Sequence, residues 1–272
     1  MTNITILGLG AMGSRMADRL DAAGHAVTRW NRSGATRTPR EAVAAADIVI
    51  AMLRDDEASR NVWLDPETGA LAGMKPGALA IESSTLTQGF VLELAKASSA
   101  AEVRFLDAPV LGSRPQAEAG QLVHLIGGAA ADLEAAAPVL AAIGGKQLHV
   151  GPAGSGAAMK LIANTLFGIQ VSAMAELIAR MRRLGLDPAK GVELLAQTPL
   201  LSPGAQGASG LMLAGKDDPM FPVELVAKDF RYAIGDDPDA MPLASAALEV
   251  FKNAAASGFG DHNLTSVHKL YK

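Results

Sequence analysis

Near the amino end the chain reads Asn3-Ile-Thr-Ile-Leu-Gly-Leu-Gly-Ala-Met-Gly-Ser-Arg-Met-Ala-Asp-Arg-Leu20, and this stretch decides the fold. Its first apolar residues predict a short buried strand, and its last nine predict an amphipathic helix. Between the two, Gly8, Gly10 and Gly13 fall at the spacing G-x-G-x-x-G. A strand, three glycines at this spacing and a helix together are typical of a nucleotide-binding turn.

Each glycine has a physical role in that interpretation. Gly8 permits the tight turn from strand to helix, Gly10 lets the backbone approach a pyrophosphate, and Gly13 lets the helix pack closely on the strand. The pyrophosphate would lie at the helix N-terminus, where free N–H groups favour anions. The alternative is a purely structural glycine-rich turn. The residues predicted to contact the cofactor are Gly8, Leu9, Gly10, Ala11, Met12 and Gly13.

The end of the second predicted strand, residues 26–30, bears on the choice of cofactor. A binder of NAD normally has an acidic residue there to hold the ribose 2′-hydroxyl, but this chain has Asn31, Arg32 and Ser33. A guanidinium can pair with a 2′-phosphate, which a carboxylate would repel. We therefore expect NADP(H) to be preferred, with NAD(H) possible. The alternative is that Arg32 is an ordinary surface charge.

Composition sets further bounds. The chain has 272 residues, 49% of them hydrophobic, a net charge of −4 and no cysteine. This length favours two domains. The net charge argues against a nucleic-acid partner, and the lack of cysteine excludes disulfides and thiolate ligands. We see no signal peptide, no apolar stretch that would span a membrane and no metal-ligand spacing among the five histidines, so we expect a cytoplasmic protein.

Strand and helix patterns alternate through the first half and then stop. Predicted strands cover 47–53, 78–81, 103–106, 122–126 and 147–150, with helices at 39–46, 88–100 and 132–142. This alternation predicts an α/β domain with a Rossmann-type, doubly wound parallel sheet. After about residue 151 only helical periodicity remains. We expect an NADP-binding domain at 1–152 and an all-helical domain for substrate binding and oligomerisation at 153–272.

The second half begins with a long predicted helix. Its apolar pattern runs from Ala157 to Leu184, with Ser155 as the expected N-cap, and Gly185 ends it. Lys160 and Asn164 lie one turn apart on the same face, in otherwise apolar surroundings. A partly desolvated lysine beside a nicotinamide is suited to proton transfer. An exposed polar seam would also explain the pair. Further helices are expected at 188–197, 204–214, 223–234, 241–257 and 264–270.

Four separated segments resemble the β-hydroxyacid dehydrogenase family, which includes 3-hydroxyisobutyrate dehydrogenase, and within it the glyoxylate/succinic semialdehyde reductases. The segments are the glycine motif at 8–17, a substrate-binding segment Asp107-Ala-Pro-Val-Leu-Gly-Ser-Arg-Pro-Gln-Ala-Glu-Ala-Gly-Gln-Leu122, a catalytic segment Gly151-Pro-Ala-Gly-Ser-Gly-Ala-Ala-Met-Lys-Leu-Ile-Ala-Asn164 and the pair Lys228-Asp229. Together they cover nearly the whole length of the chain.

The resemblance implies roles for particular residues. Lys160 would be the general acid and base, Asn164 would hydrogen-bond the substrate, and Gly112 with Ser113 would hold its carboxylate through backbone N–H groups, an arrangement that consecutive amides allow. The substrate would be a small carbonyl or hydroxy acid. Residues implied to line the cofactor are Met52, Leu53, Thr85 and Lys228. Without the resemblance, Thr85 reads as a turn residue and Lys228 as a surface lysine.

Two positions depart from the family pattern. Leu111 stands where relatives usually have serine, which leaves the substrate open because a lost polar contact can change specificity strongly. Arg54 stands where many relatives have proline. Two other functions remain as alternatives: an imine reductase, against which Lys160 argues, and a non-catalytic dehydrogenase-like module. The resemblance also implies a homodimer or homotetramer.

Overall fold

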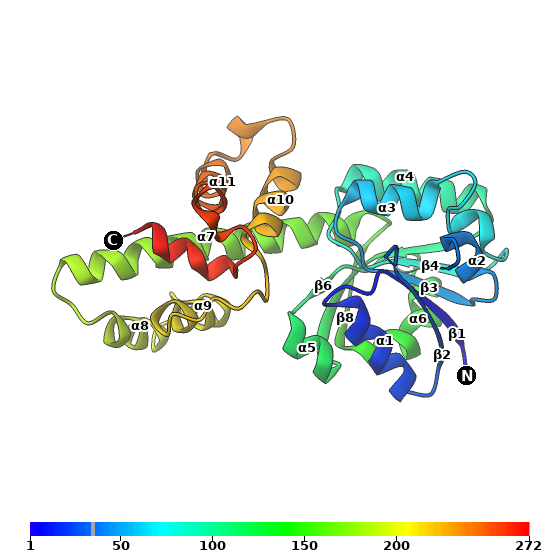
Figure 1. Ribbon diagram of the computed structural model, residues 1–272, viewed down its shortest axis with the longest axis horizontal. Helices are drawn as coiled ribbons and strands as arrows, with labels where there is room; N and C mark the ends of the chain where they lie inside the picture. The colour runs from blue at the N-terminus through cyan, green and yellow to red at the C-terminus, as the bar shows by residue number, and fades with distance from the viewer. Residues whose placement is uncertain (34–35, 272) are drawn as a thin grey trace. The chain divides into compact units, whose positions relative to one another are not determined.

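The computed structural model describes residues 1–33 and 36–271. The chain forms two compact units, Met1–Lys160 and Leu161–Lys272. Figure 1 traces both, and the division between them falls within the long helix α7 (Ser155–Arg183). Each unit is described by itself.

The first unit contains an eight-stranded sheet whose first five strands are parallel. They are β1 (Asn3–Leu7), β2 (Ala26–Trp30), β3 (Ile48–Ala51), β4 (Leu79–Glu82) and β5 (Arg104–Asp107), in the order β2-β1-β3-β4-β5. The predicted doubly wound, mostly parallel sheet is confirmed.

Beyond β5 the sheet changes direction. β7 (Leu122–Gly128) runs antiparallel to β5 and to the short β6 (Val110–Leu111), and β8 (Gly144–Gly151) runs parallel to β7. A parallel return needs a long crossover connection. The helix between β6 and β7 is α5 (Arg114–Ala119), which has six residues and is too short for one.

Two apolar cores cover the two faces of the sheet. In β3, Val49 and Ala51 belong to one core while Ile48 and Ile50 belong to the other, as strand alternation requires. One face is covered by α2 (Pro39–Val43), α3 (Asp56–Leu64) and α4 (Gln88–Ala100), and the other by α1 (Gly13–Ala22) and α6 (Ala130–Ile143), as Figure 1 shows. A short 3-10 helix, η1, covers Leu71–Gly73.

This topology fixes where a site can form. The carboxyl ends of the parallel strands meet at one edge of the sheet. Because β1 lies between β2 and β3, the chain crosses one face of the sheet from β1 to β2 and the opposite face from β2 to β3. Ligands of such folds bind outside the carboxyl ends at this switch point. Gly8 follows β1 there and Met52 follows β3.

The second unit is helical from the later part of α7 onward. Its core gathers Val171, Met212, Phe230 and Phe251, with the two phenylalanine ring centroids 5.6 Å apart. Gly168 of α7 leaves room for Phe230, whose ring carbon Cε2 lies 2.5 Å from where a Cβ would stand. The further elements are α8 (Pro188–Ala196), α9 (Pro203–Leu213), α10 (Val223–Ile234), η2 (Pro238–Ala240), α11 (Pro242–Ala254), η3 (Ala255–Phe259) and η4 (Leu264–Leu270).

Helix α7 has the predicted length but not the predicted cap. It begins at Ser155 itself. The carboxylate of Asp107, at the end of β5, accepts from the N–H groups of Gly154, just before the helix, and of Ala157 in its first turn. The prediction of Ser155 as the N-cap is therefore wrong. By length and composition α7 could cross a membrane, contrary to the sequence expectation, and half of its most apolar window is buried inside the protein.

Candidate active site

The glycine turn after β1 has the geometry that its spacing predicts. Gly8 has a φ of +100°, and a Cβ there would lie 2.3 Å from the Met52 carbonyl oxygen. A Cβ on Gly13 would lie 2.0 Å from the Gly8 carbonyl oxygen, so this glycine is needed for close packing. At Gly10 a Cβ would meet no atom within 4 Å. The turn therefore leaves open space at the position where a pyrophosphate would approach the backbone.

The N-terminus of α1 fits an anion as well. Within the described residues no side chain caps this helix, and its first turn contains no acidic residue. The Ser14 N–H of this turn donates to the Gly10 carbonyl oxygen at 3.1 Å, so it is mainly the positive end of the helix dipole that would attract a phosphate here. The residues present fit the predicted dinucleotide, whose pyrophosphate Gly10 and the first turn of α1 would hold.

The end of β2 carries the predicted cofactor-selecting residues. The Asn31 side-chain amide donates to the Ser33 hydroxyl at 3.0 Å, and Arg32 is exposed. The buried Trp30 donates its indole N–H to the Arg37 carbonyl oxygen at 2.8 Å, which anchors the segment. Arg32 is thus presented on the surface at the carboxyl end of β2.

The loops after β3 and β4 contain predicted cofactor-lining residues, and hydrogen bonds join these two loops. The Leu53 N–H donates to the Ser84 hydroxyl at 2.7 Å, and the Ser84 N–H donates to the Glu82 carboxylate at 2.8 Å. Met52, Leu53 and Thr85 are half-buried at this edge. The structure therefore brings these three predicted residues to the same strand ends as the glycine turn.

Asp107, at the end of β5, anchors the helix that carries Lys160. Its carboxylate accepts hydrogen bonds from the N–H groups of Gly154 at 2.7 Å and Ala157 at 2.8 Å. Burial raises the pKa of Asp107, and these backbone hydrogen bonds oppose the rise. Lys160 follows Ala157 by about one turn. Its side chain is buried, with 8% of the residue exposed, as a proton-transfer group at a desolvated site requires.

The segment from 110 to 119 contains the predicted carboxylate-binding residues. Gly112 has a φ of +118°, which favours glycine, and it is exposed. The Ser113 N–H donates to the Gln116 side-chain oxygen at 2.9 Å, so this amide is already engaged within the segment. An ion pair between Arg15 and Glu118, at 2.7 Å, connects α1 to α5.

The other two predicted site residues lie in the second unit and are joined there through Asp229. The Asn164 amide donates to Asp229 Oδ2 at 2.6 Å, and Lys228 Nζ lies 2.9 Å from Asp229 Oδ1. Lys228 also lies over the Tyr232 ring, 4.5 Å from its centroid. All three polar side chains are buried, so we call Asn164, Lys228 and Asp229 the buried polar cluster.

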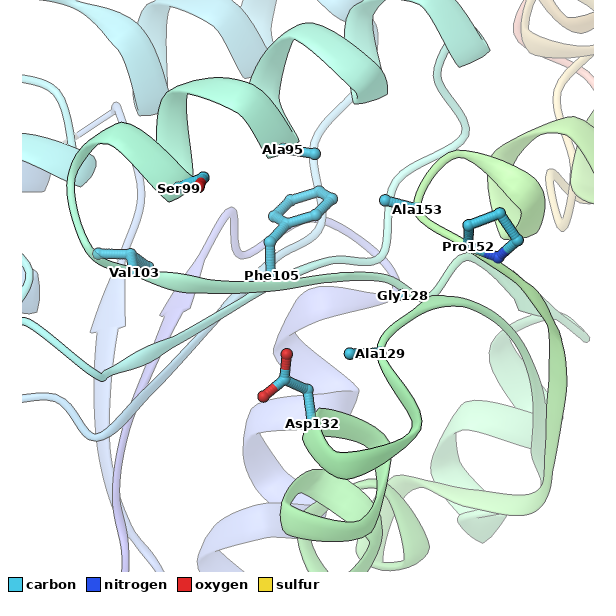
Figure 2. Close-up of a pocket in the computed structure, with 9 residues that line it drawn as sticks. All are labelled: Ala95, Ser99, Val103, Phe105, Gly128, Ala129, Asp132, Pro152 and Ala153. Carbon is cyan, nitrogen blue, oxygen red and sulfur yellow. The ribbon is translucent and has the colours of Figure 1, made fainter.

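The first unit contains a pocket of about 440 Å³ (Figure 2). It lies between α4, the start of β5 and the first turn of α6, and contains none of the predicted site residues. Its lining is Ala95, Ser99, Val103, Phe105, Gly128, Ala129, Asp132, Pro152 and Ala153. Among residues 1–33 and 36–271, no three His, Asp or Glu side chains are grouped to hold a metal ion.

Sequence reasoning missed three buried carboxylates that hydrogen-bond predicted site residues or the segments that carry them: Glu82, Asp107 and Asp229. A signal was available for two of them. Glu82 and Asp107 each end an apolar strand, where a buried charge needs donors from its surroundings. Asp229 was noticed only as half of a motif, and its contact with Asn164, 65 residues away, left no local trace.

Comparisons with known proteins agree with this geometry. The profile of the NAD binding domain of 6-phosphogluconate dehydrogenase matches residues 3–151. The profile described as NAD-binding of NADP-dependent 3-hydroxyisobutyrate dehydrogenase matches residues 154–271. Together they cover almost the whole chain.

Individual relatives are similar to this chain over nearly its whole length. The chain is 34% identical to the chloroplastic glyoxylate/succinic semialdehyde reductase 2 of Arabidopsis thaliana, covering 99% of this chain and 79% of the relative. It is also 34% identical to the cytokine-like nuclear factor N-PAC of Mus musculus, over 98% of this chain but 50% of that protein. The structure is similar to a Mycobacterium tuberculosis 3-hydroxyisobutyrate dehydrogenase crystallised with L-serine, with a TM-score of 0.90, 29% identity and full coverage of both chains.

The glycine turn, the uncapped helix behind it and the buried lysine on α7 thus occur in a chain whose two halves both match dehydrogenase profiles. The chain belongs to the β-hydroxyacid dehydrogenase family as a 3-hydroxyisobutyrate dehydrogenase-like member, and it is an NAD(P)-dependent oxidoreductase acting on CH–OH groups.

Proposed function

We propose that this protein reduces a small semialdehyde or keto acid to the hydroxy acid with NADPH, and catalyses the reverse reaction with NADP+. The observation that carries the proposal is Lys160, buried one turn after a helix start that Asp107 fixes to the same strand edge as the glycine turn. The bound nicotinamide supplies the hydride to the carbonyl carbon.

In this proposal Lys160 supplies the proton to the carbonyl oxygen as negative charge develops on it, and removes the proton in the reverse direction. Gly112 and Ser113 hold the substrate carboxylate. Since the Ser113 N–H is bonded to Gln116, carboxylate binding there requires the Gln116 side chain to move or the Ser113 hydroxyl to serve instead. Asn164 hydrogen-bonds the substrate from its place beside Asp229.

The preference for NADP(H) is supported by the exposed Arg32 at the end of β2 and by Asn31 where an NAD binder has an acid. Residues 154–271 match the profile of an NADP-dependent 3-hydroxyisobutyrate dehydrogenase, which also supports NADP(H). The substrate class is supported by relatives named as glyoxylate/succinic semialdehyde reductases and as 3-hydroxyisobutyrate dehydrogenases.

The test follows absorbance at 340 nm with glyoxylate, succinic semialdehyde, tartronate semialdehyde, methylmalonate semialdehyde and a cyclic imine, each with NADPH and with NADH. We expect rapid turnover of at least one aldehyde acid with NADPH. Turnover of the imine alone would identify an imine reductase. NADPH binding without any turnover would favour a non-catalytic role, which the match to N-PAC makes worth measuring.

We further propose that the protein acts as a homodimer or homotetramer in the cytoplasm. Ile162, Leu166 and Leu177 of α7 are each about half exposed, and a second copy could cover them. Light scattering should give two or four times the chain mass of 28.0 kDa. A monomer would contradict this part of the proposal.

A further inference from the structure

Two buried carboxylates lie next to each other at the carboxyl edge of the sheet. Glu82 ends β4 and Asp107 ends β5, and the two residues are register partners in this parallel pair. Their side chains therefore point to the same face. Neither residue has any exposed surface. Two such charges can be buried together only if each is surrounded by its own hydrogen-bond donors.

Glu82 has donors from helix α3 and from the loop after β4. One oxygen accepts from the Ser59 hydroxyl at 2.6 Å and the Trp63 indole at 2.8 Å, and the other accepts from the Ser84 N–H at 2.8 Å. The Ser84 hydroxyl in turn accepts from the Leu53 N–H at 2.7 Å. Glu82 therefore connects the loops after β3 and β4, both of which are predicted to line the cofactor.

Asp107 is bonded to a different segment. Its two oxygens accept from the N–H groups of Gly154, which directly precedes α7, and of Ala157 in the first turn of α7. Nearby glycines allow this approach: a Cβ on Gly127 would lie 2.4 Å from Asp107 Oδ1, and a Cβ on Gly156 would lie 2.9 Å from Oδ2. The same residue begins the substrate-binding segment, so it joins that segment to the helix that carries Lys160.

We propose that Glu82 and Asp107 are positioning residues with separate tasks, Glu82 fixing the cofactor-lining loops and Asp107 fixing the orientation of the Lys160 helix. This inference rests on the proposed function, because it takes Met52, Leu53 and Thr85 as cofactor contacts and Lys160 as the proton-transfer group. Neither carboxylate touches the reacting atoms. Each acts through the backbone that it holds.

The two tasks predict opposite kinetic signatures for isosteric variants. Glu82→Gln presents an NH2 group to one of its donors, and we expect the Kd for NADPH to rise about tenfold while kcat at saturating NADPH changes by less than about threefold. Asp107→Asn likewise presents an NH2 group to one of the two N–H donors at the start of α7. There we expect kcat to fall about 30- to 100-fold, because a misplacement of about 1 Å is costly in catalysis, with the Kd for NADPH within about twofold of the wild-type value.

A matched control separates positioning from loss of a helix cap as such. Asp187 caps α8 through the Ala189 N–H at 2.9 Å, and α8 carries no predicted site residue. Asp187→Asn should leave kcat and the Kd for NADPH unchanged. If Glu82→Gln does not fold, Ser84→Ala removes the hydroxyl that accepts from the Leu53 N–H and should raise the Kd for NADPH. If Asp107→Asn does not fold, Asp107→Ser retains one capping oxygen and should still lower kcat.

Hydrogen exchange gives a readout that does not depend on turnover. The Gly154 and Ala157 amides should exchange at least about tenfold faster in Asp107→Asn and at the wild-type rate in Glu82→Gln and Asp187→Asn. If the wild-type protein turns over nothing in the panel, the proposed function fails, and the exchange rates with the NADPH affinities still decide this inference. The inference is overturned if both variants lose kcat and NADPH affinity together in step with melting temperature, or if both behave as the wild type.

Discussion

The two units hold their buried charges in different ways. In the first unit, the Asp107 carboxylate is held by backbone N–H groups, and Glu82 is held by one backbone N–H and two side chains of α3. In the second unit, the buried polar cluster consists of contacts between side chains: the Asn164 amide donates a hydrogen bond to Asp229, and Lys228 forms an ion pair with it.

The difference determines what a single side chain can position in each unit. A backbone donor is fixed by the strand or helix that contains it, so a carboxylate in the first unit positions whole segments. A side-chain donor is fixed by helix packing, and removing one charged member of the buried polar cluster weakens the compensation of the other buried charge.

The largest effect is expected at Lys160, the last residue of the first unit. Lys160→Met removes the proton-transfer group, and kcat should fall about 10²- to 10⁴-fold while the Kd for NADPH stays nearly constant. Lys146→Met, at an exposed lysine of β8, is the control and should behave as the wild type. Full turnover by Lys160→Met, measured in steady state at 340 nm, would remove Lys160 from the mechanism.

As the pH falls, we expect the first unit to lose stability at a higher pH than the second unit does. Burial lowers the pKa of His124 to about 4 from its ordinary 6.5, so between these values the unfolded chain binds a proton that the folded chain does not. The free energy of unfolding should therefore fall by about 2 kcal/mol between pH 7 and pH 5 from this residue alone. In the second unit, Lys269 and His262 hold the pKa of Asp217 at about 2, so its contribution is lost only below its ordinary pKa of 3.8.

Urea denaturation at several pH values measures this effect against His124→Gln. The variant is needed because burial raises the pKa values of Glu82 and Asp107, whose contributions have the opposite sign: they favour the folded state at low pH and fade as the pH rises. We expect a shallower pH dependence in the variant. Parallel curves for the two proteins would show that His124 does not titrate as described.

A double-mutant cycle tests the buried polar cluster. Asp229→Asn removes the carboxylate charge that the buried Lys228 ammonium contacts and should lower the free energy of unfolding by about 3 kcal/mol. Adding Lys228→Met should recover part of that loss, because the buried positive charge is then removed as well. Chemical denaturation of the wild type, both single variants and the double variant gives the coupling. Strictly additive losses would mean that the pair is not coupled in the folded protein.

The smallest effect concerns the cofactor. Arg32→Ala should raise the Kd for NADPH about tenfold and leave that for NADH unchanged, because only NADPH offers a 2′-phosphate to a guanidinium. Arg29→Ala is the matched control, since Arg29, in the strand just before Arg32, is paired with Asp18 and Asp21. Fluorescence titration measures both constants, and an equal loss for both cofactors would contradict the proposed selectivity.

The sequence predicted the first unit well because its signals are local. The glycine turn, the alternating strands and the length of α7 all follow from patterns a few residues long. Helix α3 and the short β6 and α5 were not predicted. The last two lie in the Asp107–Leu122 segment, whose interpretation rested on resemblance, and its antiparallel return depends on a connection too short for a crossover.

The site was predictable only in part, because several of its contacts join residues that are far apart in the sequence. Lys160 and Asn164 were found from helical spacing, and Gly10 from its motif. The bonds from Asp107 to Gly154 and from Asn164 to Asp229 join residues 47 and 65 positions apart, and only tertiary packing brings them together. Asp107 even replaced the predicted local cap, Ser155, because a buried carboxylate at a strand end satisfies more than one amide of the helix.

Direct hydride transfer is tested best with NADPH carrying deuterium at both C4 positions, together with the aldehyde acid that turns over fastest. We expect a hydroxy acid one mass unit heavier than the product made with ordinary NADPH, because the hydride passes directly from the nicotinamide to the carbonyl carbon. A product without deuterium, or no product from any aldehyde acid despite NADPH binding, would contradict it.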